Sequence, residues 1–224
     1  GLTQEQAVDR IFLFDYHGLV TKDREGLTPL KQKFAHEQEP QSTFLDAIGE
    51  VKPTAIVGCA AQAGSFNAYV LSAMARINER PIIFALSNPT SRSECTAREA
   101  YTYTEGKCLF ASGSPFPQVE VNGKTFIPRQ SNNSYVFPGI GLGLVVSSPR
   151  IVPQSVFLSA AEALSKIVSE DDLENGSLFP SLTKIREVSQ SIAAAVAEQC
   201  FTAGVAGVPK PDDLSKAIQE AMYK

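Results

Sequence analysis

Short apolar runs alternate with helical patterns through the first half of the chain. Four of these runs are typical of buried strands: residues 11–14, 55–59, 82–86 and 108–111. Helices are predicted over residues 4–9, where Thr3 and Gln6 suit a capping box, over residues 66–78, and from Ser93 to about residue 103. This alternation predicts βαβ units and an α/β fold with a doubly wound, mostly parallel sheet of Rossmann type.

The second half of the chain is predicted to be mainly helical, after one hairpin and one short strand. Residues 117–129 predict the hairpin, because Asn122-Gly123 is the strongest two-residue turn signal in the sequence. A last strand is expected over residues 135–138, and helices near 140–147, 154–168, 181–203 and 211–222. We therefore expect a partial Rossmann-like domain over residues 1–150 and, over residues 151–224, a helical extension packed on it.

Small or polar residues follow each predicted strand. The residues at these corners are Asp15, the segment 58–64 that includes Gly58, Cys59, Ala60 and Ala61, then Ser87 and Asn88, and finally residues 112–114. The carboxyl ends of parallel strands meet at one edge of a sheet, and ligands bind there. Ordinary turn chemistry explains any single corner equally well. Four such corners at one edge favour a ligand crevice.

Charge and cysteine content narrow the function classes. The formal net charge of −4 comes without a basic run, which argues against nucleic acid or an anionic membrane surface as a partner. Four cysteines lie far apart without a CxxC pair, so neither a zinc site nor a disulfide framework is indicated. Cys59 and Cys108 are expected to be small, inert core residues. With no signal-peptide pattern and no long apolar segment, we expect a soluble protein of a reduced compartment.

An acidic residue at the end of a strand is typical of the ribose-binding carboxylate of a Rossmann fold, and Asp15 holds such a position. The partner motif G-x-G-x-x-G does not precede it, because only fourteen residues do. From the residues alone, Asp15 is either a ribose ligand or a turn former.

Three segments carry a resemblance to a known family. "IFLFDYHGLV", "FALSNPTSRSECTAREAYTYTEGKCLFASGSPF" and "NNSYVFPGIGLG" are similar, in order and spacing, to the cofactor-binding domain of malic enzymes. The resemblance implies oxidative decarboxylation of L-malate to pyruvate and CO₂ with reduction of NAD or NADP. Family members are more than twice as long, and their amino-terminal half carries the catalytic residues, the Mn²⁺ or Mg²⁺ ligands and the glycine-rich loop. The chain would then be a fragment that lacks this half and its first strand, and is inactive alone.

The resemblance also implies roles for individual residues. Coenzyme contacts are expected from Asp15, Lys31, Gly58, Cys59, Ala60, Ala61, Ser87 and Asn88, and substrate contacts from Asn88, Asn132 and Asn133. An asparagine amide both donates and accepts without carrying charge, which suits positioning, although an Asx-turn is the alternative for each. Lys31 matches a lysine that serves the 2′-phosphate in NADP-preferring members, so we expect NADP to be favoured over NAD. A solvated lysine is the alternative there.

The sequence departs from the family pattern before the predicted last strand. Arg129 and Ser131 replace two glycines that usually precede the asparagine pair. If those glycines have positive φ, the replacements would strain the loop or alter it. The missing first strand should also leave edges and apolar faces unpaired near Phe12, Ala55 and Ile56, with low stability, aggregation or completion by another chain as the expected result.

Compartment, assembly and two further functions complete these expectations. Family members are tetramers, so the full-length protein is expected to be one as well. A cytoplasmic location is expected, with the mitochondrial matrix as the alternative. Another NAD(P)-dependent dehydrogenase, such as an amino-acid dehydrogenase, is a competing function, but the order of the motifs argues against it. The other competing function is that of a noncatalytic binding or interaction module that kept the fold.

Overall fold

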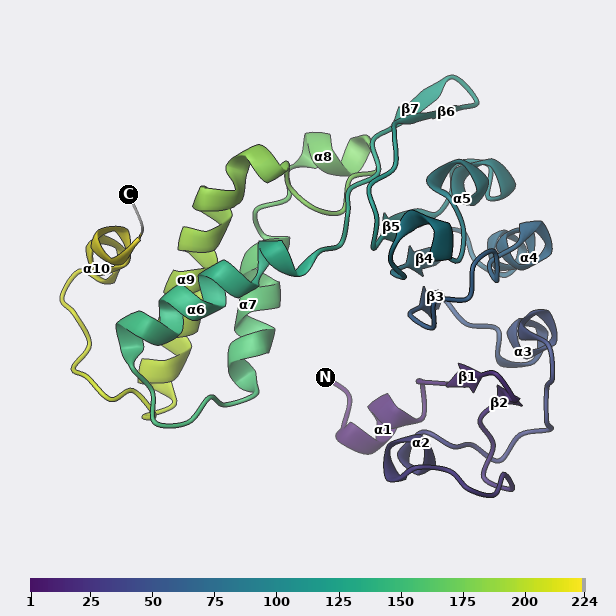
Figure 1. Cartoon of the computed structure of the whole chain (residues 1–224), viewed down its shortest axis with the longest axis horizontal. Coiled ribbons are helices and arrows are strands. Elements are labelled where there is room, and N and C mark those ends of the chain that lie inside the picture. Colours follow the sequence, from purple (N-terminus) through teal and green to yellow (C-terminus); the bar gives the residue numbers. More distant parts are fainter. Residues whose placement is uncertain (223–224) are drawn as a thin grey trace. The chain divides into compact units, whose positions relative to one another are not determined.

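Three of the predicted apolar runs pair side by side as a parallel sheet in the computed structural model, which describes residues 1–222 (Figure 1). The strands are β3 (Ala55–Gly58), β4 (Ile82–Ala85) and β5 (Leu109–Ser112), in the order β3-β4-β5. Their register aligns Ala55 with Ile82 and Ile82 with Leu109. The small residues that end β3, β4 and β5 therefore lie along one edge of this sheet, as predicted.

The helices that connect these strands begin where the sequence supplies caps. In α4 (Ala68–Ile77), Asn67 accepts hydrogen bonds from the backbone of the first turn, and in α5 (Ala97–Tyr103) Thr96 and Glu99 form a capping box. The strand order follows the sequence order, so right-handed crossovers place both helices on the same face of the sheet. Figure 1 shows α4 and α5 in a row with α3 (Phe44–Val51) beside β3, β4 and β5.

One face of the sheet is buried and the other is only partly covered. Ile83 and Phe110 are 0% exposed, whereas Val57 of β3 is 56% exposed. The run at residues 82–86 is predicted to be a buried strand, and this prediction is wrong for Ile82 and Phe84, which are only partly buried. The physical reason is that the helices cover a single face. The α/β fold with a parallel Rossmann-type sheet is confirmed.

The amino-terminal strand differs from its prediction. Residues 11–14 do not join the parallel sheet; β1 (Phe14–Asp15) instead pairs antiparallel with β2 (Gly18–Leu19). The chain turns back through Gly18, whose φ of 104° suits glycine, and the backbone N–H of Val20 donates to the carbonyl of Leu13 at 2.8 Å. A local hairpin thus supplies the backbone hydrogen bonds that a parallel neighbour would provide. The helix α1 (Gln4–Val8) that precedes it has the predicted Thr3–Gln6 capping box.

The chain divides into two compact units, Gly1–Thr125 (unit 1) and Phe126–Lys224 (unit 2). The predicted division at residue 150 concerns functional domains and stays a prediction. The boundary between the units falls in the predicted hairpin of β6 (Val119–Val121) and β7 (Lys124–Phe126). Asn122 and Gly123 both have positive φ there, as a two-residue hairpin turn requires.

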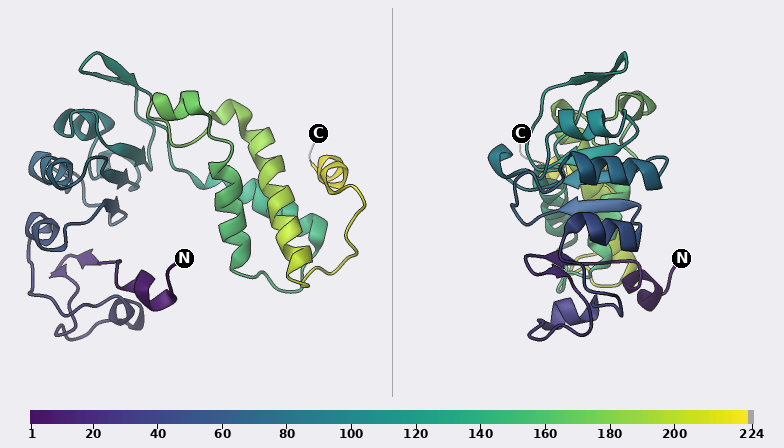
Figure 2. Two further views of the ribbon diagram at one scale, coloured as in Figure 1. Left: turned by 180° about the vertical axis from the view of Figure 1, so that it is seen from behind. Right: turned by 90° about the vertical axis from the view of Figure 1, so that its right-hand side faces the viewer.

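Unit 2 is helical. Its elements, seen from two further sides in Figure 2, are η2 (Asn133–Tyr135), α6 (Phe137–Ser147), α7 (Ser155–Ser165), α8 (Glu170–Glu174), η3 (Leu182–Lys184), α9 (Ile185–Thr202) and α10 (Leu214–Ala221). The strand predicted at residues 135–138 is therefore wrong. Pro138 lies in the first turn of α6, where its missing N–H leaves no hydrogen bond unmade, and the run continues as helix.

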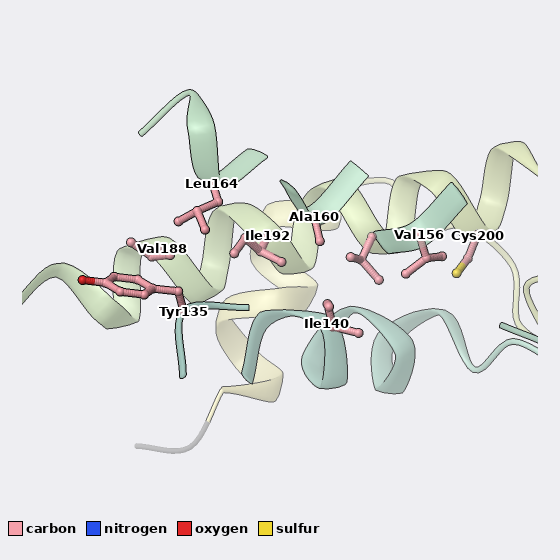
Figure 3. Packing of buried hydrophobic residues seen from close by; sticks show 9 residues of the cluster. Tyr135, Ile140, Val156, Ala160, Leu164, Val188, Ile192 and Cys200 are labelled. Atoms are coloured by element: carbon pink, nitrogen blue, oxygen red, sulfur yellow. The ribbon is translucent and has the colours of Figure 1, made fainter. Parts of the chain in front are cut away.

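The core of unit 2 lies between α6, α7 and α9. Tyr135, Ile140, Val156 and Ile192 are among the buried side chains of this cluster (Figure 3). Helix α6 approaches α9 closely because it presents glycine at the contact. A Cβ built on Gly143 would lie 2.7 Å from the carbonyl oxygen of Ala193. Among the described residues, no helix is both long and apolar enough to span a bilayer.

Candidate functional site

Asp15, at the end of β1, lies between two cationic side chains. Both terminal carboxylate oxygens of Asp15 accept from Nη2 of Arg24 at 3.0 Å, and Nζ of Lys31 donates to Oδ2. The backbone N–H of His17 adds a fourth hydrogen bond at 2.9 Å. Arg24 also donates to the carbonyl oxygens of Gly18 and Leu19, which fixes its guanidinium against the β1–β2 hairpin. Two cations share one carboxylate here, so the cluster carries one net positive charge.

Helix α2 (Pro29–Lys33) supplies Lys31 to this cluster. Thr28 caps the helix and Pro29 occupies its first turn, so the sequence fixes where the helix begins. The Lys31 side chain is 38% exposed, against about a fifth for Asp15 and Arg24. The side chain of Lys31 is therefore the part of the cluster that is most exposed.

The electrostatics of Asp15 favour its charged form. Burial raises the pKa of this carboxyl, but the hydrogen bonds from Arg24, Lys31 and the His17 backbone together hold it well below its ordinary range. Asp15 is therefore an anion at neutral pH. An additional anionic group, such as a phosphate, would find the positive charge of Lys31 only half compensated.

The ends of β4 and β5 form a second polar corner in unit 1. Asn88 follows β4 and its Oδ1 accepts from Oγ of Ser114 at 2.8 Å, while Oγ of Ser87 accepts from the backbone N–H of Ala61 at 2.9 Å. These bonds join the loops that follow β3, β4 and β5 at one edge of the sheet. The sequence predicted this convergence, but with Asp15 as a fourth corner at the same edge, and that part is wrong because Asp15 ends β1, which belongs to a separate two-stranded sheet.

Gly113 allows the ends of β4 and β5 to meet. A Cβ built on Gly113 would lie 2.1 Å from the carbonyl oxygen of Leu86 and 2.9 Å from Nδ2 of Asn88. The backbone N–H of Gly113 donates to the carbonyl of Ala85 at 2.9 Å. Any larger residue would push the Asn88 loop away from the corner.

Residues of the β3–α4 loop that were predicted to contact a coenzyme differ in exposure. Cys59 and Ala60 are exposed, Ala61 is partly buried, and Gly58 is buried. The expectation that Cys59 is a core residue is wrong, because β3 ends at Gly58 and the chain then leaves the sheet. Cys108 is buried as predicted, and burial raises its pKa to about 12. All four cysteines are free.

Asn132 and Asn133 lie in unit 2, at the start of η2. Oδ1 of Asn132 accepts from the backbone N–H of Ser134 at 2.9 Å, which is the Asx-type role given as the alternative, and both asparagines are exposed. Because Asn88 belongs to unit 1, a substrate contact shared by the three asparagines stays a prediction. Neither Arg129 nor Ser131 has a positive φ, so the loop is unstrained at the two positions that replace glycine.

Two residues of the two polar corners were missed from the sequence. Arg24 contacts Asp15 directly, and Glu94 accepts hydrogen bonds from Ser87. Ser114, which lies in a predicted corner, contacts Asn88. A cation nine residues after an acidic strand end was the only signal for Arg24. Glu94 gave none, because an acidic residue before a helix is ordinary capping chemistry.

The described residues hold no candidate metal centre. Within residues 1–222, no three or more His, Cys, Asp or Glu side chains gather as a metal ion would require.

Comparisons with known proteins agree with the resemblance. The family described as "Malic enzyme, NAD binding domain" matches residues 1–201. The chain is 48% identical over 221 residues to the "NADP-dependent malic enzyme, chloroplastic" of Zea mays, which covers 98% of this chain and 35% of the maize protein. It is 46% identical over 224 residues to the "NAD-dependent malic enzyme, mitochondrial" of Ascaris suum, covering all of this chain and 35% of that protein.

A third relative and one solved structure extend the comparison. The "NADP-dependent malic enzyme" of Anas platyrhynchos is 46% identical over 225 residues, covering all of this chain and 40% of the duck protein. The crystal structure of the Entamoeba histolytica malic enzyme superposes with a TM-score of 0.70 at 23% identity, covering 95% of this chain and 43% of that one. This likeness shows the fold. The chain thus spans 35 to 40% of the length of these three relatives.

Proposed function

Because the chain belongs to the malic enzyme family, by the NAD-binding domain that matches residues 1–201, we propose that unit 1 binds the dinucleotide coenzyme of a malic enzyme and prefers NADP to NAD. The complete protein would oxidatively decarboxylate L-malate to pyruvate and CO₂ and reduce the coenzyme. The parts of the enzyme that lie outside this chain would supply the metal ligands and the acid–base groups. Residues 1–222 would bind and position the coenzyme and would take no catalytic step themselves.

The observation that carries this proposal is the pair of cations at Asp15. Rossmann-type sites hold the adenosine ribose with an acidic residue after a strand, and a nearby cation accommodates the 2′-phosphate of NADP. Asp15 supplies the acid and Lys31 the more exposed cation. A bound phosphate would take over part of the contact that Lys31 makes with Asp15. Lys31 would then donate one charge-assisted hydrogen bond to Asp15 and a second to the phosphate. NAD, which has a hydroxyl in that place, would gain little from Lys31.

The second polar corner would orient the reactive end of the coenzyme and the substrate. When bound, the coenzyme supplies the hydride acceptor, and the protein contributes its position. Residues 59–61 offer backbone groups along the edge of the sheet, held there by the buried Ser87, and Asn88 offers an exposed amide. These groups bind and orient without charge, which suits contacts to an amide or a carboxyl group.

Titration of the chain with each coenzyme tests the proposal. Lys31→Gln should weaken NADP binding by about 10-fold, the value of one lost charge-assisted hydrogen bond, and leave NAD binding within about 2-fold. Lys33→Gln is the matched control, since Lys33 lies in the same helix but over the ring of Phe34 rather than at Asp15. Equal losses for both coenzymes would refute the NADP preference. If the chain without substitutions bound neither coenzyme, this result would favour the noncatalytic alternative.

Alkylation of Cys59 gives an independent test. In the native chain iodoacetamide should modify Cys59 first, because the other three cysteines are buried. Bound coenzyme over residues 59–61 should slow this modification several-fold, as followed by intact mass. If the coenzyme slows modification of Cys59 in the native chain but not in the denatured chain, the bound coenzyme covers the loop. Modification at the same rate with saturating coenzyme would place the coenzyme elsewhere.

A further inference from the structure

Glu94 is a buried acid in the segment between η1 (Thr90–Arg92) and α5. It is 2% exposed, and its two carboxylate oxygens both accept from Ser87: Oε1 from the hydroxyl and Oε2 from the backbone N–H at 3.3 Å. No ion pair to Glu94 is found within residues 1–222. A buried acid without a cation lowers stability, and proteins tolerate such groups mainly at functional sites.

The carboxylate of Glu94 sets the direction of the Ser87 hydroxyl. A hydroxyl donates one hydrogen bond, and that of Ser87 is donated to Glu94, so its lone pairs are available for the backbone N–H of Ala61. Ala61 has a φ of 54°, a conformation that an alanine rarely adopts. The hydrogen bond from Ala61 therefore holds the β3–α4 loop in an unfavourable backbone state.

The backbone beside Glu94 ties down the rest of this loop. The carbonyl of Ser93 accepts from the N–H of Gly64 at 3.2 Å, and the carbonyl of Glu94 accepts from Phe66 at 3.0 Å. At the start of the loop, a Cβ on Gly58 would lie 2.4 Å from both Cγ and Cδ of Glu94. Because Gly58, at the end of β3, has no side chain, the side chain of Glu94 can pass beside it and reach Ser87. Residues 61–66 are thus held by Ser87 at Ala61 and by the backbone of residues 93–94 at Gly64 and Phe66.

We propose that Glu94 is a positioning residue for the coenzyme, which fixes residues 59–65 and Ser87 in the conformation that the coenzyme binds. The inference rests on the proposed function, since it assigns this loop to the coenzyme. Glu94 is too deeply buried to touch a ligand, so it acts through Ser87 and Ala61.

Three variants of the whole chain test the inference. Glu94→Ala removes both acceptors, and Glu94→Gln fits the same space, keeping the acceptor for the hydroxyl but presenting an amide to the Ser87 N–H. Ile83→Val, in the buried face of β4, is the control for a general loss of stability. Hydrogen exchange followed by mass spectrometry reports the protection of residues 59–66, and titration reports the dissociation constants of NADP and NAD.

Glu94→Ala should accelerate exchange in residues 59–66 by at least 10-fold and weaken both coenzymes by a similar factor. Glu94→Gln should give smaller changes of the same kind, and Ile83→Val should leave both dissociation constants unaltered. Unchanged coenzyme binding in Glu94→Ala would overturn the inference and leave the proposed function standing. A loss in Ile83→Val as large as in Glu94→Gln would also overturn it, since the role would be structural only. An unaltered chain that binds neither coenzyme would overturn both proposals.

Discussion

Unit 1 and unit 2 bury their apolar side chains in different ways. In unit 2 the cluster between α6, α7 and α9 is closed by residues of the unit itself, and Ile192 and Val196 are 0% exposed. In unit 1 the helices cover one face of the β3–β4–β5 sheet, and Val57 is 56% exposed on the other side. Unit 2 therefore has a closed apolar core, whereas helices cover only one of the two faces of the sheet in unit 1.

The difference also separates the polar chemistry. The hydrogen-bonded corners around Asp15, Ser87 and Asn88 all lie in unit 1, where backbone loops leave the ends of strands. Sites need exposed, precisely held loops, and closed helical cores provide few of them. The half-covered unit is thus the one that carries the candidate coenzyme site. The low stability expected near Phe12, Ala55 and Ile56 concerns this unit and stays a prediction.

The largest expected contrast comes from truncating one apolar side chain in each unit. Ile192→Ala should lower the free energy of unfolding of unit 2 by about 2–5 kcal/mol, because it leaves a cavity in a closed core. Val57→Ala should cost unit 1 less than about 1 kcal/mol, because the side chain is already half in water. Urea unfolding with hydrogen exchange of α9 and β3 peptides reports the units separately. Equal losses would show that the exposed face of the sheet is covered in solution.

A pair of glycines in α6 gives the next contrast. Gly143→Ala should destabilise unit 2 by about 1–3 kcal/mol, since its Cβ would meet the Ala193 carbonyl at 2.7 Å. Gly141→Ala should stabilise the same helix by about 0.5–1 kcal/mol, because nothing lies within 4 Å of its Cβ and alanine is the better helix former. Thermal unfolding followed by circular dichroism measures both. Two changes of the same sign would contradict the close approach of α6 and α9.

Much of the fold could be predicted from the sequence wherever local signals agree. The strands β3, β4 and β5, the capping boxes at Thr3 and Thr96, and the Asn122-Gly123 hairpin each follow from residues within one short segment. Residues 135–138 failed because an aromatic and β-branched run suits a strand and a helix start equally well, and Pro138 decides for the helix only in context. The prediction that residues 11–14 form a strand of the parallel sheet failed because strand pairing depends on which neighbouring strand is present.

The candidate site was predictable in part. Strand ends at one edge of a parallel sheet brought Ser87 and Asn88 to the expected corner. The partners of Asp15 depend on the path of the chain after β2, which returns Arg24 to the hairpin and places Lys31 on α2. Residue spacing does not reveal that path for Arg24. The exposure of Cys59 depends on the residue at which β3 ends, and a shift of one position separates a buried thiol from an exposed one.

The smallest expected effect is a difference in how the stability of the two units changes as the pH falls. Burial raises the pKa of Asp15, but Arg24, Lys31 and the His17 backbone lower it further, so the folded carboxyl has a pKa below its ordinary value of 3.8. A depressed pKa adds stability that is present above the ordinary value and is lost as the pH falls toward the folded one. Asp15→Asn should therefore cost unit 1 about 1 kcal/mol at pH 7, as expected for a partly exposed ion pair.

This cost should shrink as the pH falls below about 4, because the unaltered Asp15 then loses its own charge-dependent advantage. Hydrogen exchange of peptides from β1 and α2, measured from pH 7 downward with rates corrected for intrinsic pH dependence, gives the comparison. Peptides from α9 serve as the control, since unit 2 holds no part of this cluster. A cost that stayed constant with pH would mean that Asp15 contributes through shape and neutral hydrogen bonds, and the charge balance around Lys31 would no longer support a phosphate site.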